Sequence, residues 1–409
     1  MRCWPLAVFL LSGAVASGQI DSTLLRGRAT ADTSGNRSLN MDAVYRRPFL
    51  TFDQVPVSLG GYVEAKAQHI GTDGVSDGLS FALQRMTLFM ASSIGPRLRF
   101  LTEVELEEGG REIALEFAAL DLELHPLFAL RGGVIMTPIG AFNQNHDGPK
   151  WEFTERPLAA VRMLPATWSN TGFGVHGKRS KGAWTYGYEA YLTNGFDATI
   201  ISNAEGRTFL PASRDNPDRF TESANGVPLV SAKAAVRHER LGEVGISTMG
   251  GVFNQFKADG LTLDRRRRVD VVAIDFNTVS QRWGTSVLGE WAWVVVDVPA
   301  TYSQQFGTRQ RGGFVDIVQP VLRRRVFGFN KAVLNLALRL GHVDHNVGRF
   351  KESGTVIGDE VLEIVPGLSF RPVPGTVIRL NYRIERAYDL FRDPPARTGG
   401  FQFGVASYF

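Results

Sequence analysis

The chain has 409 residues, of which 44% are hydrophobic, 11% aromatic and 21% charged, and its formal net charge is +4. This weakly basic balance does not predict a nucleic-acid partner. The single cysteine, Cys3, lies at the N-terminus. The rest of the chain therefore offers no disulfide and no thiolate ligand, and its histidines are scattered, so neither a metal site nor a cofactor is predicted.

Residues 1–18 have the pattern of a secretory signal peptide. A cationic start at Arg2 precedes a mainly apolar run from Leu6 to Val15, and the small residues Ala16 and Gly18 stand where a signal peptidase would cut. The alternative is a membrane anchor, but this run is shorter than the roughly 20 residues that a spanning helix needs.

Residues 19–52 are polar and lack a sustained hydrophobic period, so we expect a flexible periplasmic arm there. A regular pattern then continues to the last residue, which predicts one closed domain over 53–409. In 333–341, for example, leucine occupies every even position and Arg339 lies on the opposite face. Alternation of this kind is typical of strands with one apolar side.

Sixteen strands can be placed by this alternation. They lie near 57–68, 81–93, 97–107, 114–124, 127–136, 170–179, 182–193, 229–239, 243–253, 267–278, 283–295, 311–322, 332–344, 359–371, 374–386 and 400–409. The strand over 311–322 is the weakest of these, because Pro320 cannot donate to a strand ladder.

The connections between these strands differ in length according to their side. Long ones follow odd-numbered strands, beginning with 137–169, and tight turns follow even-numbered strands; 323–331 is an exception that we interpret as a longer turn. Long external loops and short periplasmic turns are typical of barrels in the outer membrane of Gram-negative-type bacteria. A soluble β-sandwich would also alternate, but it would not need one-sided loop lengths. We therefore predict an all-β, transmembrane antiparallel barrel of about 16 strands.

The last strand ends on Phe409, with Phe401, Phe403 and Val405 on the same face. A terminal aromatic after alternating apolar residues resembles the signal by which outer-membrane barrels are recognised for insertion. Phe409 is therefore the candidate insertion signal.

Part of the chain, about 81–195, resembles the phosphate-selective porins O and P. The residues that carry the likeness are FALQRM at 81–86, RLRFLTEVELE at 97–107, LDLE at 120–123, TPIG at 137–140, NHD at 145–147, ERPL at 155–158, LPATW at 164–168 and GFG at 172–174. The resemblance implies a sixteen-stranded barrel, usually a homotrimer, that passes small anions. The chain departs from the family where Asp147 is followed by Gly148 and in lacking a clear lysine cluster.

Two sets of residues are candidates for selectivity. Seven of the cations that the alternation turns toward the lumen are candidates for lining the pore, namely Arg85, Arg99, Arg131, Lys233, Arg339, Arg379 and Arg383. If they gather on one wall they form a ladder for anions, and if they pair with acids they stiffen the barrel. The long connection 137–169 is expected to fold back as a constriction, the alternative being a surface loop. Its candidate residues are Asn145, His146, Asp147, Glu155, Arg156 and Arg162.

The predicted function is passive diffusion of small hydrophilic solutes or anions, with phosphate preference left open. The predicted partners besides the solute are outer-membrane lipid and lipopolysaccharide. The run Arg265–Arg268 would lie at an external rim, solvated or touching lipopolysaccharide phosphates, and Arg323–Arg325 at the periplasmic rim. One alternative is a barrel for hydrophobic solutes, which would need an apolar lumen. Another is an outer-membrane hydrolase, but Ser247 lacks a nucleophile-elbow pattern.

Overall fold

The computed structural model describes residues 37–52 and 55–409. The expected signal peptide, residues 1–18, lies outside the described residues. No helix in the described part of the chain is both long and apolar enough to span a membrane.

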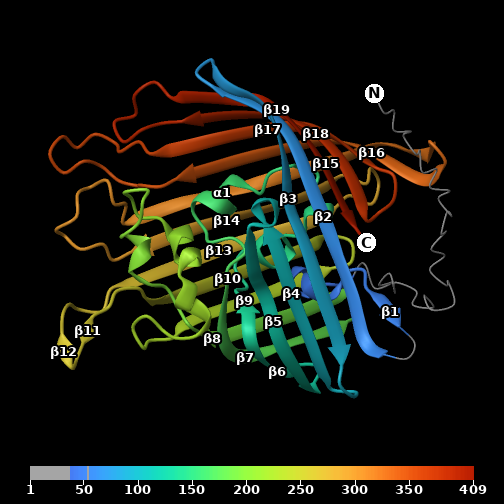
Figure 1. Cartoon of the computed structure of the whole chain (residues 1–409), viewed down its shortest axis with the longest axis horizontal. Helices are drawn as coiled ribbons and strands as arrows, with labels where there is room; N and C mark the ends of the chain where they lie inside the picture. Colours follow the sequence, from blue (N-terminus) through green and yellow to red (C-terminus); the bar gives the residue numbers. More distant parts are fainter. Residues whose placement is uncertain (1–36, 53–54) are drawn as a thin grey trace, which may run out of the picture.

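A closed antiparallel sheet of sixteen strands forms the wall (Figure 1), which confirms the predicted fold. These strands are β2 (Val55–Thr72), β3 (Val75–Ser93), β4 (Leu98–Glu107), β5 (Glu112–His125), β6 (Phe128–Met136), β7 (Ser169–Lys181), β8 (Trp184–Thr193), β9 (Leu229–His238), β10 (Gly242–Val252), β13 (Arg268–Val279), β14 (Ser286–Val296), β15 (Arg309–Val326), β16 (Phe329–Asp344), β17 (Glu360–Arg371), β18 (Thr376–Ala387) and β19 (Ala396–Tyr408). Each strand pairs with its neighbours in sequence, and β19 pairs with β2 to close the barrel.

The remaining elements are short. They are β1 (Leu50–Phe52), β11 (Lys257–Ala258), β12 (Leu261–Thr262), the helix α1 (Leu158–Arg162) and the 3-10 turns η1 (Asn40–Tyr45), η2 (Glu108–Gly110), η3 (Asn143–Asn145), η4 (Gly148–Lys150), η5 (Ala198–Ile200), η6 (Leu210–Asp215) and η7 (Pro217–Phe220). β1 pairs with β2, and β11 pairs with β12 in an external loop.

The two faces of the wall differ as the alternation predicts. On β16, Leu336 and Leu340 are 51% and 43% exposed on the outer face, whereas Arg339 between them is buried on the inner face. Apolar side chains covering the outside of a closed barrel require lipid around it, and a barrel has no strand edge to leave unpaired there. The protein is therefore an outer-membrane barrel.

The connection between β15 and β16 corrects one expectation. Residues 323–331 do not form a longer turn, because the strands continue to a two-residue turn at Phe327-Gly328. Both turn residues have positive φ, of 49° and 85°, which matches the twist of a tight hairpin. Pro320 is accommodated at a shift of register between Pro320 and Leu322, where a missing N–H breaks no regular ladder.

The end of the expected flexible arm is ordered inside the barrel. Residues 37–49, called here the N-terminal segment, enter the lumen, and Leu39, Met41 and Val44 are buried there. Leu39 and Met41 pack against Ala235 of β9. Leu39 lies immediately before a short 3-10 turn, and Met41 and Val44 lie within it; this element is too short to produce a hydrophobic period in the sequence.

Candidate pore constriction

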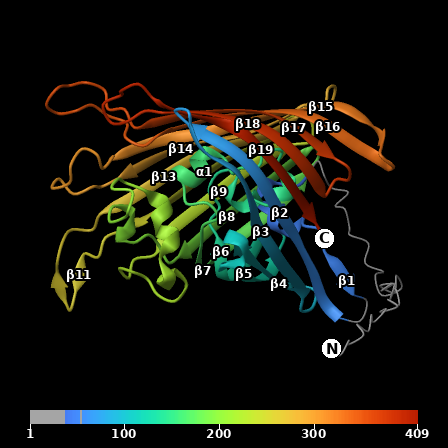
Figure 2. The ribbon, with the colours of Figure 1, turned by 45° about the horizontal axis from the view of Figure 1, so that its top comes forward.

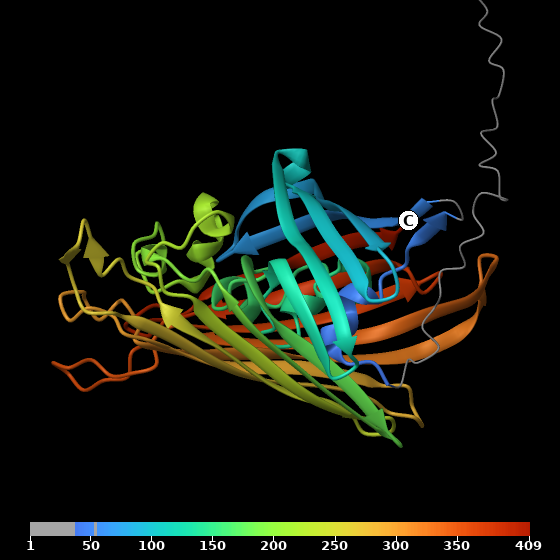
Figure 3. The same ribbon diagram turned by 90° about the horizontal axis from the view of Figure 1, so that it is seen from below.

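The connection between β6 and β7, residues 137–168, folds into the barrel, and we call it the lumen loop (Figure 3). Its two ends are tied together, since Thr137 N donates to Trp168 O at 3.0 Å. Asn143 reinforces this closure: its side chain donates to Thr137 O and accepts from Trp168 N, at 2.7 and 2.9 Å. The loop therefore enters and leaves the lumen at one point on the wall.

The first half of the lumen loop is held by β9, β10 and β14. The Glu290 carboxylate accepts from the backbone N–H groups of Ala141 and Phe142, at 2.6 and 3.1 Å. Lys233 Nζ donates to Gly140 O at 2.6 Å and pairs with Asp275 at 2.7 Å. Gly140 N donates to the Ser247 hydroxyl at 3.0 Å, so this serine anchors the loop.

The backbone of Gly140 has φ +63° and runs so close to Glu290 that an added Cβ would lie 2.3 Å from the Glu290 carboxylate. Only glycine allows this close approach without strain. The hydrogen bonds from loop to wall therefore depend on Gly140, which the sequence offered only as the last residue of TPIG at 137–140.

The second half of the lumen loop is held from the opposite wall. Arg379 on β18 is buried, and its guanidinium donates to the carbonyls of Gly148, Trp151 and Phe153. The same group pairs with Glu64 on β2. Thr154 donates to Asn381 through both its backbone N–H and its hydroxyl, each at 2.9 Å.

Arg339 has a similar anchoring position. Its guanidinium pairs with Asp316 at 2.7 Å and donates to Glu155 O at 2.7 Å. Of the seven predicted lumen cations, Lys233, Arg339 and Arg379 thus hold the lumen loop.

Between the loop and the wall formed by β3, β17 and β18 there is a cavity of about 280 Å³. It is lined by Arg85, Glu155, Arg156, Leu158, Val161, Arg162, Glu363 and Arg383. The structure therefore brings together two of the predicted wall cations and three of the predicted loop residues. These eight side chains form the candidate constriction.

Each guanidinium in the constriction has carboxylate partners. Arg85 lies 3.2 Å from Glu64 and 3.1 Å from Glu105. Arg383 lies 3.3 Å from Glu363. The ion pairs of the remaining two are Arg156 with Glu105 at 3.3 Å and Arg162 with Glu385 at 2.9 Å. The arginines of the constriction are thus fixed in place and their charge is partly neutralised.

The other two predicted wall cations lie away from the constriction. Arg131 is buried, pairs with Asp121 at 2.7 Å and donates to the hydroxyls of Tyr191 and Tyr45. Arg99 is half-exposed and pairs with Glu123. These cations stiffen the wall where the N-terminal segment is seated.

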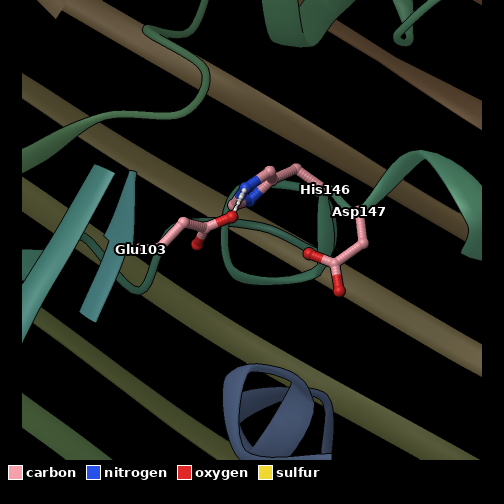
Figure 4. Close-up of side chains that lie close together, drawn as sticks. All are labelled: Glu103, His146 and Asp147. Carbon is pink, nitrogen blue, oxygen red and sulfur yellow. Dashed lines mark ion pairs between the residues drawn. The ribbon is translucent and has the colours of Figure 1, made fainter. Parts of the chain in front are cut away.

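Asn145, His146 and Asp147 do not line the cavity, and His146 and Asp147 lie close to Glu103 of β4 (Figure 4). Ligand atoms of Glu103, His146 and Asp147 lie within 4.8 Å of one another, an arrangement that could hold a metal ion. However, Arg47 lies 2.7 Å from both carboxylates and Lys150 lies 3.0 Å from Asp147. The cluster is therefore already compensated by two cationic side chains.

The electrostatics of this cluster follow from its burial and its pairs. Burial by itself would raise the pKa of Asp147, but the nearby Arg47 and Lys150 hold that pKa well below its usual range. Burial by itself would lower the pKa of His146. The Glu103 carboxylate, 3.5 Å from Nε2, outweighs this effect and raises the pKa of His146 above its usual value. The cluster is a buried polar junction between the N-terminal segment, the lumen loop and β4.

The C-terminal Phe409 lies at the rim next to β2. Its backbone N–H donates to Gly61 O at 3.0 Å, and its side chain is 52% exposed. Its role as an insertion signal stays a prediction.

No family model matches the chain. An uncharacterized protein of Aquifex aeolicus is 35% identical over 149 residues, and the chain spans about a third of that relative's length (33%). The resemblance to the phosphate-selective porins remains a prediction.

Solved structures of outer-membrane proteins are similar to the whole barrel. OprB of Pseudomonas putida has a TM-score of 0.55 at 11% identity, covering 86% of this chain and 93% of that one. An anion-selective porin from Comamonas acidovorans has a TM-score of 0.54 at 12% identity, and the match covers 86% of this chain and 99% of that one. OmpF of Salmonella typhi, in complex with daunomycin, has a TM-score of 0.51 at 11% identity, and the match covers 87% of this chain and 98% of that one. At these identities the similarity shows the fold alone, which is that of an outer-membrane β-barrel.

Proposed function

We propose that the protein is a porin through which small hydrophilic solutes diffuse passively, with a weak preference for anions over cations. The observation that carries this proposal is the charge of the constriction. Four arginines and two glutamates line the cavity, a formal surplus of two positive charges. Charged side chains that line a pore lower the barrier for ions of opposite sign.

The surplus supports only a weak preference. Each of the four guanidinium groups already faces a carboxylate: Arg85 and Glu105 are 3.1 Å apart, Arg156 and Glu105 3.3 Å, Arg162 and Glu385 2.9 Å, and Arg383 and Glu363 3.3 Å. A dianion such as phosphate would have to compete with these acids to gain hydrogen bonds. Tight phosphate selection is therefore not included in the proposal. A polar, charged constriction also disfavours the alternative of a channel for hydrophobic solutes.

A homotrimer in the outer membrane is the assembly that we propose for this pore. The basis is the resemblance of residues 81–195 to the phosphate-selective porins, a family that is usually trimeric. Native mass spectrometry in detergent tests this, and a monomer under conditions that preserve the fold would contradict it.

The proposed selectivity is tested by reversal potentials across planar bilayers in a KCl gradient. We expect a modest chloride preference, which Arg162→Gln should reduce, because the Arg162 side chain is the most exposed of the four, at 38%. The matched control is Arg266→Gln, an exposed arginine in an external loop, which should leave the reversal potential nearly unchanged. Cation preference in the unmodified protein would contradict the proposal.

A further inference from the structure

The hairpin of β15 and β16 is longer than the wall to which it belongs. β14 pairs with β15 only as far as Val318, and β17 pairs with β16 only as far as Val333. Beyond these points the backbone of the hairpin has, among residues 37–52 and 55–409, strand partners only within the hairpin itself. Figure 2 shows this hairpin projecting past its neighbours, at the end of the barrel that carries the short turns and the C-terminus. That end is periplasmic, because long loops are external in such barrels.

The projecting part is strongly basic. The hairpin carries Arg323, Arg324, Arg325 and Lys331, and the adjoining turn between β13 and β14 carries Arg282; we call these five the basic rim. The turn lies against the hairpin, since Gln319 donates to Trp283 O at 3.3 Å. None of the five forms an ion pair with any residue of 37–52 or 55–409, and 276–289 and 317–343 contain no Asp or Glu. This part of the surface is therefore a local positive field without internal compensation.

Large apolar side chains stand among these cations. Phe327 is 89% exposed and Trp283 is 65% exposed, and Val321 and Phe329 are also exposed. Phe329 lies on β16, a strand whose outer face carries exposed apolar residues such as Leu336. Aromatic side chains with arginines and lysines at the edge of an apolar band suit the headgroup region of a bilayer, where the rings meet the acyl boundary and the cations reach phosphate.

We propose that the basic rim binds the phosphates of anionic phospholipids in the periplasmic leaflet of the outer membrane. A Lys or Arg side chain near an anionic bilayer surface is attracted to it, and several together act additively. The exposed aromatics favour a lipid over a soluble polyanion, because a polyanion away from the bilayer would leave them in water. The three consecutive arginines also discourage pairing of the free strand edges with another chain. Protection of the strand edges alone, however, would require neither the exposed aromatic side chains nor Arg282, which lies on a separate turn.

The test uses the full barrel with Cys3 replaced by Ser and a spin label at Asn330→Cys, an exposed hairpin position. The protein is reconstituted into phosphatidylcholine vesicles with and without phosphatidylglycerol, and accessibility of the label to a water-soluble relaxation agent is measured. We expect phosphatidylglycerol to lower the accessibility. The triple variant R323Q/R324Q/R325Q should lose this response, and its retention of phosphatidylglycerol in native mass spectrometry should fall roughly tenfold or more.

The matched control is R265Q/R266Q/R268Q, which removes three exposed arginines from the external side. It should keep the response, and both triples should keep heat-modifiable migration as folded barrels. Should the triple variant misfold, a salt titration of the unmodified chain still decides the matter, because screening must abolish a surface attraction to phosphate. Equal accessibility with and without phosphatidylglycerol, a response insensitive to salt, or protection by isolated peptidoglycan instead of vesicles would each overturn the proposal.

Discussion

Arg47 Nη2 lies 2.7 Å from Asp147 Oδ1, with both side chains fully buried, so the N-terminal segment is joined to the lumen loop by one ion pair. The same nitrogen lies 2.7 Å from Glu103 on β4. Three parts of the chain that are far apart in sequence therefore share a single guanidinium. The position of the lumen loop depends on residues that the sequence assigned to a flexible arm.

Arg47→Gln should release the N-terminal segment and loosen the lumen loop. The change leaves two buried carboxylates without their shared cation, and breaking a buried pair in this way costs about 3–5 kcal/mol. Limited proteolysis should cut within 137–168, and the midpoint of urea unfolding should fall. Arg37→Gln, which breaks an exposed pair with Glu239, is the control and should have almost no effect. Equal behaviour of the two variants would refute this account of Arg47.

Arg379 and Arg383 should give different phenotypes although they lie on the same face of β18, four residues apart. Arg383 lines the constriction, so Arg383→Gln should shift the reversal potential toward cation preference with conductance of the same order. Arg379 is buried beneath the lumen loop, so Arg379→Gln should raise current noise and protease sensitivity. Both are measured on single channels at low salt. A pure selectivity change in Arg379→Gln would show that this residue faces solute.

The external loop that begins at His345 should lose order as the pH falls. Burial, reinforced by Arg207 and Arg162, lowers the pKa of His345 from 6.5 to about 3. The unfolded loop takes up a proton below about pH 6.5 while the folded loop does not, so stability present above pH 6.5 declines as the pH falls toward 3. At pH 5 the loss is about 1–2 kcal/mol. Hydrogen exchange of residues 345–359 at pH 7 and pH 5 measures it, and His345→Gln should remove the difference.

Gly140→Ala should destabilise the lumen loop. The new Cβ would meet the Glu290 carboxylate, and φ of +63° is unfavourable for alanine, which together cost about 1–3 kcal/mol. Gly348→Ala is the matched control, because its added Cβ would lie 3.7 Å from Ile357, in ordinary contact. Thermal melting of the two variants compares them. A melting point for Gly140→Ala equal to that of the control would mean that the loop is held elsewhere.

The orientation of the barrel can be tested with single cysteines after Cys3 is replaced. Ser353→Cys, exposed in the external loop after β16, should react with an impermeant maleimide on intact cells. Asn330→Cys should react only after the outer membrane is opened. The long loop between β8 and β9 is also external, but a label near residue 210 is less suitable because Leu210 is fully buried. The reverse labelling pattern would invert the topology.

The sequence predicted the strands of the wall well because whether each wall residue is apolar or polar depends only on the face it lies on. Leu336, Arg339 and Leu340 alternate since one face meets lipid and the other meets the lumen. The lumen loop could be placed by its length, but its contacts could not. Glu64 and Arg379 are separated by 315 residues, and nothing in either neighbourhood indicates that they pair. The N-terminal segment was missed for a related reason, since its burial depends on a lumen that exists only after the barrel has closed.

The anchors of the lumen loop also set an order of assembly. Arg379 on β18 and Glu64 on β2 lie on either side of β19, the strand whose pairing with β2 closes the barrel. The ion pair between Arg379 and Glu64 spans this seam, so the wall side of the loop anchor is complete only after the seam has formed. Contacts between such distant segments form late in folding. In a nascent barrel whose β19 has not yet paired with β2, the lumen loop is therefore not fully anchored. The constriction is completed only when this last strand joins the first.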